Sequence, residues 1–344
     1  MNMPANSPEN PTSNTHRRVG AVAIGRNEGT RLERCLDSLA TIMPRVVYVD
    51  SGSTDGSVSA AEQRGATVVN LDTSTGFTAA RARNAGCEKL LELYPDLEFV
   101  QFLDGDCELD ANWIATAQAT LDAQPQLGVV CGRRRERYPE QTIYNRICDM
   151  EWNTPIGRAR SCGGDALMRV QAWVKVGGYN PHLIAGEEPE LCVRLRQDGW
   201  FIERIDAEMT LHDAAMTRLW QWAKRAERAG HAYAEGAAMH GAPPERHCVR
   251  ESRRIWVWAI VWPLIVLLTA VLLSPWTLLG LLIYPLQIWR TARWRRRAAG
   301  DTWAQCLLYG LSCIAANWPQ CWGQISYWRN RWRGRRSELI EYKK

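Results

Sequence analysis

The chain has no Cys-x-x-Cys pair, although its eleven cysteines are scattered from Cys35 to Cys321. That absence argues against a zinc site of the usual spacing and against a thioredoxin-like redox motif. Cysteines spread in this way are typical of a reducing compartment, where they serve mostly as small apolar residues. Residues 1–17 also lack an apolar run and are rich in Asn, Pro, Ser and Thr. They predict a disordered N-terminus without a signal peptide and a first domain that stays in the cytoplasm.

Positive charge is concentrated in the C-terminal part of the chain. The 344 residues carry a formal net charge of +5 and are numerous enough for more than one structural unit. Arginine clusters at residues 290–297 and 329–336 flank uncharged stretches that are rich in Trp. Such clusters either face solvent or bind nucleic acid in many proteins. Their place beside apolar segments instead favours a membrane as partner, and no nucleic acid.

From Val19 onward, apolar runs alternate with segments of helical periodicity. Repeated strand–helix units predict an α/β domain with a parallel, helix-covered sheet that is doubly wound in the general sense. Residues 128–213 are less regular, and residues 219–239 are typical of a helix. The strands are expected at residues 19–24, 45–49, 66–69 and 99–103, and the helices at residues 30–42, 57–64 and 78–93.

Two carboxylates, Asp104 and Asp106, follow the buried run at residues 99–103. Residues i and i+2 of an extended segment point the same way, so both side chains can converge on one divalent cation. Gly105 between them allows close approach to the backbone. Taken alone, the triplet is also ordinary turn chemistry. In parallel sheets ligands bind at the carboxyl ends of strands, which is where this triplet lies.

Residues 255–289 contain no charged residue and are too long for one ordinary membrane span. Ser274-Pro275 interrupts them, which predicts a membrane hairpin with arms at 255–273 and 276–289. Because the second arm is short, a re-entrant or interfacial helix is the alternative. A second uncharged stretch, residues 302–328, is expected to lie on or dip into the membrane. A buried helical hairpin at a dimer interface is the less favoured soluble interpretation.

Three motifs follow the first, second and fourth expected strands in this order: Arg26-Asn27-Glu28, then Asp50-x-x-Ser53-x-Asp55-Gly56, then Asp104-x-Asp106. Together they resemble the family-2 glycosyltransferases of the GT-A fold, over about residues 19–239. The resemblance implies a GT-A catalytic domain at residues 18–245, followed by membrane-associated helices at residues 246–344. It also implies an inverting transfer of a sugar from a nucleoside diphosphate, with a UDP-sugar as the expected donor.

The resemblance further implies which residues bind the donor. Asp50 would contact the base, and Arg83 and Asn84, in a segment similar to the family's Ala-Arg-Asn-x-Gly, would face the donor. Asp106 would be the stronger ligand of Mg²⁺ or Mn²⁺, with Asp104 and His212 as further candidates. The expected nucleotide-sugar residues are Arg26, Asn27, Glu28, Asp50, Ser53, Asp55, Arg83, Asn84 and Asp104.

Two further segments resemble the acceptor side and the base of the family. Gly163, Gly164 and Asp165 resemble its Gly-Gly loop, and Gly186-Glu187-Glu188 resembles its Glu-Asp motif. The family's base is an Asp at the second acidic position, so Glu188 is the expected base and Glu187 the close competitor. Without the resemblance, these residues are equally a turn and an acidic helix N-terminus.

The resulting expectation is a hexosyltransferase that acts on a lipid-linked or glycan acceptor in bacterial cell-surface polysaccharide biosynthesis at the inner membrane. One alternative is a polyprenyl-phosphate glycosyltransferase, whose acceptor needs no strong base. The other is a membrane scaffold that binds sugar nucleotides without catalysis. Identity of the sugar, linkage and acceptor is left open by the sequence.

Overall fold

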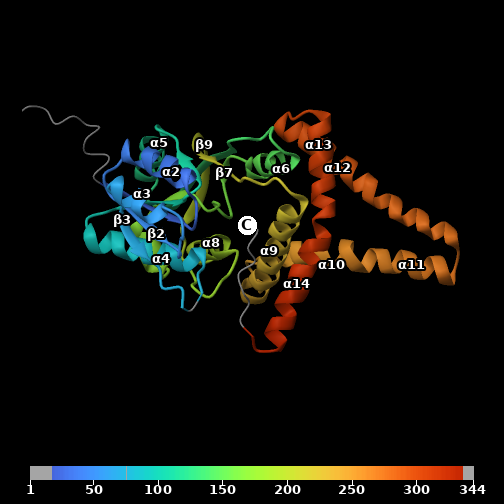
Figure 1. Cartoon of the computed structure of the whole chain (residues 1–344). Coiled ribbons are helices and arrows are strands. Elements are labelled where there is room, and N and C mark those ends of the chain that lie inside the picture. The colour runs from blue at the N-terminus through green and yellow to red at the C-terminus, as the bar shows by residue number, and fades with distance from the viewer. Residues whose placement is uncertain (1–17, 75, 336–344) are drawn as a thin grey trace, which may run out of the picture. The chain divides into compact units, whose positions relative to one another are not determined.

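The computed structural model of the protein describes residues 18–74 and 76–335 (Figure 1). The predicted disordered N-terminus and the last residues of the arginine-rich tail lie outside these ranges. The chain forms two compact units. The first contains the chain up to Arg135, Thr154–His182 and Glu187–Asp213, and the second contains Glu136–Asn153, Leu183–Gly186 and the chain from Ala214. The division therefore falls at Asp213, whereas the sequence suggested a domain end near residue 245.

The first unit is built on a mixed β-sheet with the strand order β3-β2-β1-β4-β8-β6-β9-β5, and β7 pairs with β9. Four strands run parallel and confirm the predicted ones: β1 (Val19–Gly25), β2 (Val46–Asp50), β3 (Thr67–Asn70) and β4 (Phe99–Asp104). The pairings β4–β8, β6–β8, β5–β9 and β7–β9 are antiparallel. The other strands are β5 (Cys107–Leu109), β6 (Leu127–Glu136), β7 (Gly157–Arg158), β8 (Ala166–Arg169) and β9 (Phe201–His212).

Helices cover the sheet because their apolar residues fall on one face. In α2 (Thr30–Ala40) the residues Leu32, Cys35, Leu36 and Leu39 are buried, as the helical spacing predicts. The Thr78 hydroxyl caps the next long helix by accepting the backbone N–H of Arg81. The other helices of this unit are α3 (Ser57–Gln63), α4 (Ala79–Leu93), α5 (Trp113–Ala123), α7 (Val170–Lys175) and α8 (Glu187–Gln197).

The prediction of a less regular region at residues 128–213 is wrong, because this region contains the long strands β6 and β9. The expected parallel sheet is present, and antiparallel strands extend it. Charged residues interrupt the apolar pattern of both strands, as in the run Arg133-Arg134-Arg135. Antiparallel strands tolerate such residues where one face meets polar groups, so the hydrophobic pattern alone conceals them.

The second unit is helical apart from its connections. A continuous helix, Val249–Leu272, combines α10 (Val249–Trp256), the π-helical turn η2 (Val257–Val261) and α11 (Trp262–Leu272). It is the one helix of the described residues that is long and apolar enough to cross a membrane. The remaining elements are α6 (Ile143–Trp152), α9 (Leu219–His240), the 3₁₀ segment η3 (Pro275–Leu282), α12 (Ile283–Ala299), α13 (Trp303–Ala315) and α14 (Asn317–Trp332).

The predicted hairpin at residues 255–289 is present, and it reverses at Ser274 and Pro275 (Figure 1, α11 and α12). Its arms are joined by two hydrogen bonds: the Trp262 indole N–H donates to the carbonyl of Gly280, and the Tyr284 hydroxyl donates to the carbonyl of Trp258. Most of its apolar side chains remain exposed. Val271, for example, is 84% exposed.

Helices α9 and α14 cross at two glycines. A Cβ atom on Gly230 would collide with the carbonyl oxygen of Gln320, and one on Gly323 would collide with the carbonyl oxygen of Glu227. The two backbones therefore touch without intervening side chains. The opposite side of α14 exposes Trp318, Trp322 and Trp328. Part of the second uncharged stretch is thus packed inside the unit, while its tryptophans face outward.

Candidate active site

The polar motifs that follow the first, second and fourth strands meet at one edge of the sheet. Gly25 of β1 is in register with Asp50 of β2, and Ile24 of β1 is in register with Asp104 of β4. The carboxyl ends of these parallel strands therefore bring the three motifs together. This is the edge at which parallel sheets bind ligands.

Hydrogen bonds join the segment after β1 to the loop after β2. The backbone N–H of Asn27 donates to the Ser53 hydroxyl at 2.9 Å, and the Asn27 side-chain oxygen accepts the backbone N–H of Thr54 at 2.7 Å. Asp55 accepts the backbone N–H of Gly29 at 3.1 Å. Partial burial alone would raise the pKa of Asp55, but hydrogen bonds, chiefly from Ser57, lower it overall. Asn27, Ser53 and Asp55 therefore shape this rim of the site.

Asp50 is buried and shapes the loop that follows β2. One carboxylate oxygen accepts the backbone N–H groups of Gly52 and Ser53, and the other accepts the Tyr48 hydroxyl at 3.0 Å. These bonds use much of the hydrogen-bonding capacity of the Asp50 carboxylate, which the sequence analysis expects to contact the nucleotide base of the donor.

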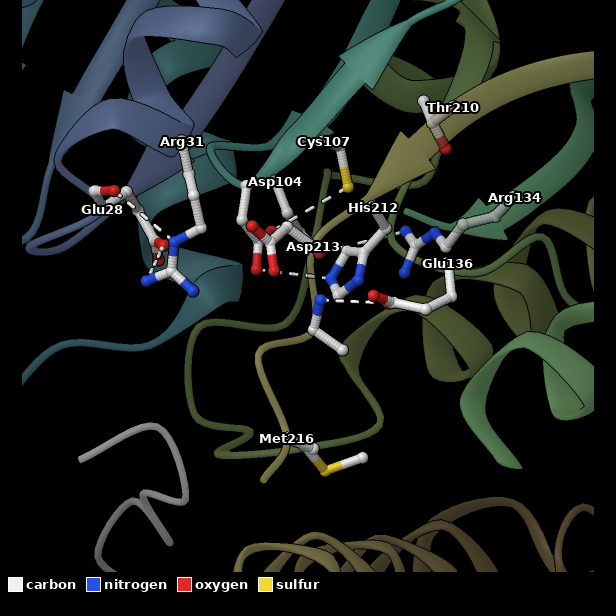
Figure 2. A network of polar contacts seen from close by, with 12 residues as sticks. Glu28, Arg31, Asp104, Cys107, Arg134, Glu136, Thr210, His212, Asp213 and Met216 are labelled. Carbon is white, nitrogen blue, oxygen red and sulfur yellow. Dashed lines mark hydrogen bonds and ion pairs between the residues drawn. The ribbon is translucent and has the colours of Figure 1, made fainter. Parts of the chain in front are cut away.

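The other two residues of the first motif have partners of different kinds. The guanidinium of the exposed Arg26 stacks over the Phe77 ring, 4.5 Å from its centroid. Glu28 forms an ion pair with Arg31 at 2.8 Å, seen at one side of Figure 2. Arg26 and Asn27 are both exposed, whereas Glu28 is half-buried.

Asp106 and His212 form the centre of the candidate metal site, and Figure 2 shows His212 near Asp104. The His212 Nε2 lies 3.3 Å from Oδ2 of Asp106, and both side chains are buried. The β5–β9 pairing places Cys107 opposite His212, so the strand register creates this contact. The ligand atoms of Asp106, Cys107 and His212 all lie within 4.8 Å of one another.

The donor set fits a divalent cation that accepts oxygen and nitrogen ligands. Carboxylate oxygen is the preferred protein ligand of Mg²⁺ and Mn²⁺, and imidazole adds a nitrogen ligand. The Asp106 carboxylate and the His212 ring would hold the ion and leave its other positions to diphosphate oxygens. The Cys107 thiol is a soft sulfur donor, which these oxygen-preferring ions accept poorly, so Cys107 is not expected among the ligands of Mg²⁺ or Mn²⁺.

Arg83 joins two of the predicted site residues. One terminal nitrogen donates to Asp104 and the other to Glu187, each at 2.7 Å, and the Arg83 side chain is only 3% exposed. Its guanidinium also lies 5.5 Å from the centroid of the Tyr179 ring. The bidentate cation thereby holds the first Asp of the Asp-x-Asp motif beside the first Glu of α8.

Asn84, predicted beside Arg83 at the donor, has other partners. Its amide nitrogen donates to the carbonyl of Tyr179 at 2.7 Å, and its oxygen accepts the backbone N–H of the same residue at 2.8 Å. Both ends of the amide are used, so Asn84 orders the backbone at Tyr179.

Asp165, which the sequence analysis expects on the acceptor side, is completely buried. Its oxygens accept the backbone N–H of Asp104 at 3.1 Å and the Thr210 hydroxyl at 2.8 Å, and Arg134 pairs with it at 2.8 Å. The sequence did not single out Arg134. The signal was available, since a charged run within the predominantly buried strand β6 requires buried partners.

The two glycines before Asp165 play different parts. A Cβ atom on Gly164 would lie 2.9 Å from Oδ2 of Asp104 and 3.0 Å from a terminal nitrogen of Arg83. Gly164 thus allows the charged groups to converge. Gly163 has a φ of +84° and open space around its Cβ position, which is a requirement of the turn alone.

Glu188 faces away from Arg83 toward two cysteines. Its Oε1 accepts the backbone N–H of Cys162 at 2.6 Å and the thiols of Cys162 and Cys192 at 3.1 and 3.0 Å. Burial raises the pKa of Glu188 above its ordinary value, although these hydrogen bonds oppose the shift. Of the two predicted bases, Glu187 is ion-paired and Glu188 is the one whose environment favours proton uptake.

Residues 22–171 match the family model for Glycosyl transferase family 2. The match spans all three motifs and the Gly163-Gly164 turn, and it ends before the α8 carboxylates. Among curated proteins, the chain is 24% identical over 198 residues to the succinoglycan biosynthesis protein ExoA of Rhizobium meliloti. It is 26% identical over 189 residues to the glycosyltransferase AglE of Haloferax volcanii. These alignments cover 52% and 51% of this chain, but only 58% and 60% of the two relatives.

Among solved structures, the chain is similar to the mannosyltransferase PcManGT from Pyrobaculum calidifontis in complex with GDP-Man and Mn²⁺. The TM-score is 0.57, and the likeness covers 91% of this chain and 88% of that chain. At 18% sequence identity this likeness concerns the fold. The match over residues 22–171 covers less than half of this chain, so the chain is similar to glycosyl transferase family 2 over that segment, and its sheet has the expected GT-A fold.

Proposed function

We propose that the protein is an inverting, metal-dependent glycosyltransferase that moves a sugar from a nucleoside diphosphate to an acceptor hydroxyl. The observation that carries the proposal is the Asp106–His212 pair, which lies on the same sheet edge as Asp104, the carboxylate that Arg83 links to Glu187. A cation ligand set and an ordered pair of carboxylates are what a diphosphate leaving group and an attacking hydroxyl require.

Each group then has a defined task. Asp106 and His212 hold Mg²⁺ or Mn²⁺, which when bound supplies positive charge for the departing diphosphate. Arg26 and Asp104 contact the donor, and Arg83 holds Asp104 in place. The acceptor oxygen attacks the anomeric carbon, the bond from that carbon to the diphosphate oxygen breaks, and the hydroxyl proton moves to Glu188. Direct displacement inverts the anomeric configuration.

The base is assigned to Glu188 for two reasons. Its pKa is raised, and the hydrogen bonds donated by Cys162 and Cys192 fix one of its carboxylate oxygens in place. Glu187 shares the Arg83 guanidinium with Asp104, and it is a positioning residue in this assignment. A Glu187→Gln variant should therefore keep the pH profile of the wild type at a reduced turnover. Glu188→Gln should instead lose the rise in rate with pH that accompanies deprotonation of the base.

The exposed apolar hairpin supports a membrane-bound enzyme with a lipid-linked acceptor. The side chains of Val271, Leu272 and Trp276 are at least three-quarters exposed, as expected of a surface that is buried in lipid. The arginines of α12 follow directly at the end of the second arm. That arrangement suits anionic lipid headgroups on the cytoplasmic side, and assembly of a cell-surface polysaccharide is the role that it suggests.

The first experiment measures release of nucleoside diphosphate from a panel of sugar nucleotides, in membranes that contain the wild type or Asp106→Ala. Metal-dependent release from one donor, lost in the variant, is the expected result. No release with any donor in the presence of lipid extract, despite nucleotide binding, would contradict the proposal and favour a binding scaffold. Full activity of Glu188→Gln would instead favour a lipid phosphate as the acceptor, since phosphate needs no base.

A further inference from the structure

A second group of potential metal ligands lies at the start of α8, apart from the Asp106–His212 pair. It consists of Cys162, which precedes the Gly163-Gly164 turn, and of Glu188 and Cys192 on successive turns of α8. The two sulfur atoms are 3.9 Å apart, and Oε1 of Glu188 lies within 3.1 Å of both. Three ligand atoms from two separate segments thus converge on one point.

The geometry points to a binding site for a soft divalent cation such as Zn²⁺, with Cys162, Cys192 and Glu188 as ligands. Zinc–sulfur bonds of about 2.3 Å at tetrahedral angles place two thiolate sulfurs about 3.8 Å apart. The observed separation of 3.9 Å requires no rearrangement of the sulfur atoms. A third ligand is supplied by the carboxylate, so one coordination position stays open for water or another donor.

The chemistry of this group separates it from the donor-side site. Mg²⁺ and Mn²⁺ prefer oxygen ligands, whereas thiolates select zinc and other soft ions. Burial raises the pKa of the Cys192 thiol to about 11, so both thiols are protonated when no metal is bound. Binding would release the two thiol protons, and affinity should therefore increase with pH.

Access to the site is provided by the turn at Cys162. This cysteine is half-buried, and its neighbours Ser161 and Gly163 are exposed, whereas Cys192 is fully buried. The three ligand atoms are buried, so a cation would approach them through this turn. Once bound, it would occupy the carboxylate of Glu188, so bound zinc should prevent sugar transfer. This last consequence rests on the proposed function, but binding of the metal does not.

The test uses the full-length protein in detergent, kept reduced with a phosphine, and titrated with Co²⁺ alone. We expect a thiolate-to-cobalt charge-transfer band that Zn²⁺ abolishes by displacement. Cys162→Ser and Cys192→Ser should each remove the band, and Glu188→Gln should weaken Co²⁺ binding by at least about tenfold. Cys107→Ser, in the donor-side group, and Cys131→Ser, at a nearby buried position, should retain the band.

A measurement on the wild type alone removes dependence on the folding of the variants. Zn²⁺ should slow alkylation of Cys162, followed by mass spectrometry, and leave the rate at the half-buried Cys313 unchanged. Absence of the charge-transfer band, its loss in Cys107→Ser, or unchanged alkylation of Cys162 would each overturn the site. A band that appears without inhibition of transfer would keep the metal site and contradict Glu188 as the base.

Discussion

The Nε2 of His212 lies 3.3 Å from Oδ2 of Asp106, at the end of the antiparallel pairing of β5 with β9. A backbone hydrogen bond lies next to this contact: the N–H of Asp213 donates to the carbonyl of Asp106 at 3.0 Å. The histidine is thus placed by strand register and is not carried on a free loop. Rigid placement of this kind is what a ligand of a catalytic metal requires.

His212→Ala should weaken Mn²⁺ binding by at least about tenfold, because the ion would lose its nitrogen ligand. The change can be followed by the electron paramagnetic resonance signal of free Mn²⁺ during titration. His182→Ala, at an exposed loop histidine of the same unit, serves as the matched control. Equal affinity of the two variants for Mn²⁺ would remove His212 from the ligand set.

Arg83→Met should destabilise the first unit by about 3 kcal/mol, because Asp104 and Glu187 would lose the buried cation between them. Turnover should decrease as well, since Asp104 would no longer be held. The control is Arg81→Met on the same helix, whose guanidinium contacts the backbone carbonyl groups of Asp72 and Gly76. Urea unfolding of both variants gives the comparison, and similar midpoints would contradict a buried bridging role for Arg83.

Gly164→Ala should lower kcat/KM by about 10²-fold with a smaller loss of stability than Arg83→Met, because the new methyl group would shift Asp104 or Arg83 without removing the buried cation. Gly56→Ala is the matched control: its φ of −76° suits alanine, and no atom lies within 4 Å of its Cβ position. A parallel loss of activity and stability in Gly164→Ala would indicate misfolding of the turn instead of a displaced site.

Val271→Arg should reduce partition into lipid vesicles, since an arginine in the apolar core of a bilayer costs about 3 kcal/mol. Vesicle sedimentation with the purified protein measures this effect. Val174→Arg, at an exposed valine of α7 in the first unit, controls for added charge on the surface. Equal sedimentation of both variants would mean that the hairpin does not enter the bilayer.

Glu235→Gln should stabilise the protein at alkaline pH. Burial raises the pKa of Glu235 from 4.5 to about 7, while Arg331 of α14 acts in the opposite direction. Below the unfolded pKa both states hold the proton, so stability is lost only as the pH rises from about 4.5 to about 7. The variant should therefore be more stable than the wild type at about pH 8, and the difference should shrink at about pH 5.

Thermal unfolding of both proteins at the two pH values measures this difference. The neighbouring His231 titrates oppositely, because burial lowers its pKa to about 4, but both proteins carry it. Glu88→Gln, at an exposed carboxyl, is the control. A pH-independent difference between Glu235→Gln and the wild type would show that the carboxyl does not titrate on unfolding.

The parallel half of the fold followed from the sequence because its strands are mostly apolar runs, as at Val19–Gly25 and Phe99–Asp104. The long antiparallel strands did not, since their charged residues break that pattern. Arg134 and Thr210 belong to these strands, so they were not predicted from the sequence as partners of Asp165. Register, which no local pattern encodes, decides that they meet.

The sequence predicted part of the residue set of the candidate site, and it predicted the position in the fold for only some of those residues. Motif order brought Asp50, Asp104 and Asp106 to one edge of the sheet, and the structure places them there. The motifs could not reveal that Asn84 serves the Tyr179 backbone or that Asp165 is buried, because both roles depend on residues far away in the chain. A polar residue in a motif therefore predicts the region of the fold in which it lies, but not the groups that it contacts.

The crossing of α9 and α14 makes the last described helix an integral part of its unit. Gly230 and Gly323 bring the two backbones together, and Gln324 adds a hydrogen bond with Ser252 of α10 at 2.7 Å. Truncation before α14 would uncover the main chain of α9 at a surface with no side chain to shield it. A shortened protein that ends after α13 would therefore be expected to aggregate, so the C-terminal helices belong in any expressed form of the enzyme.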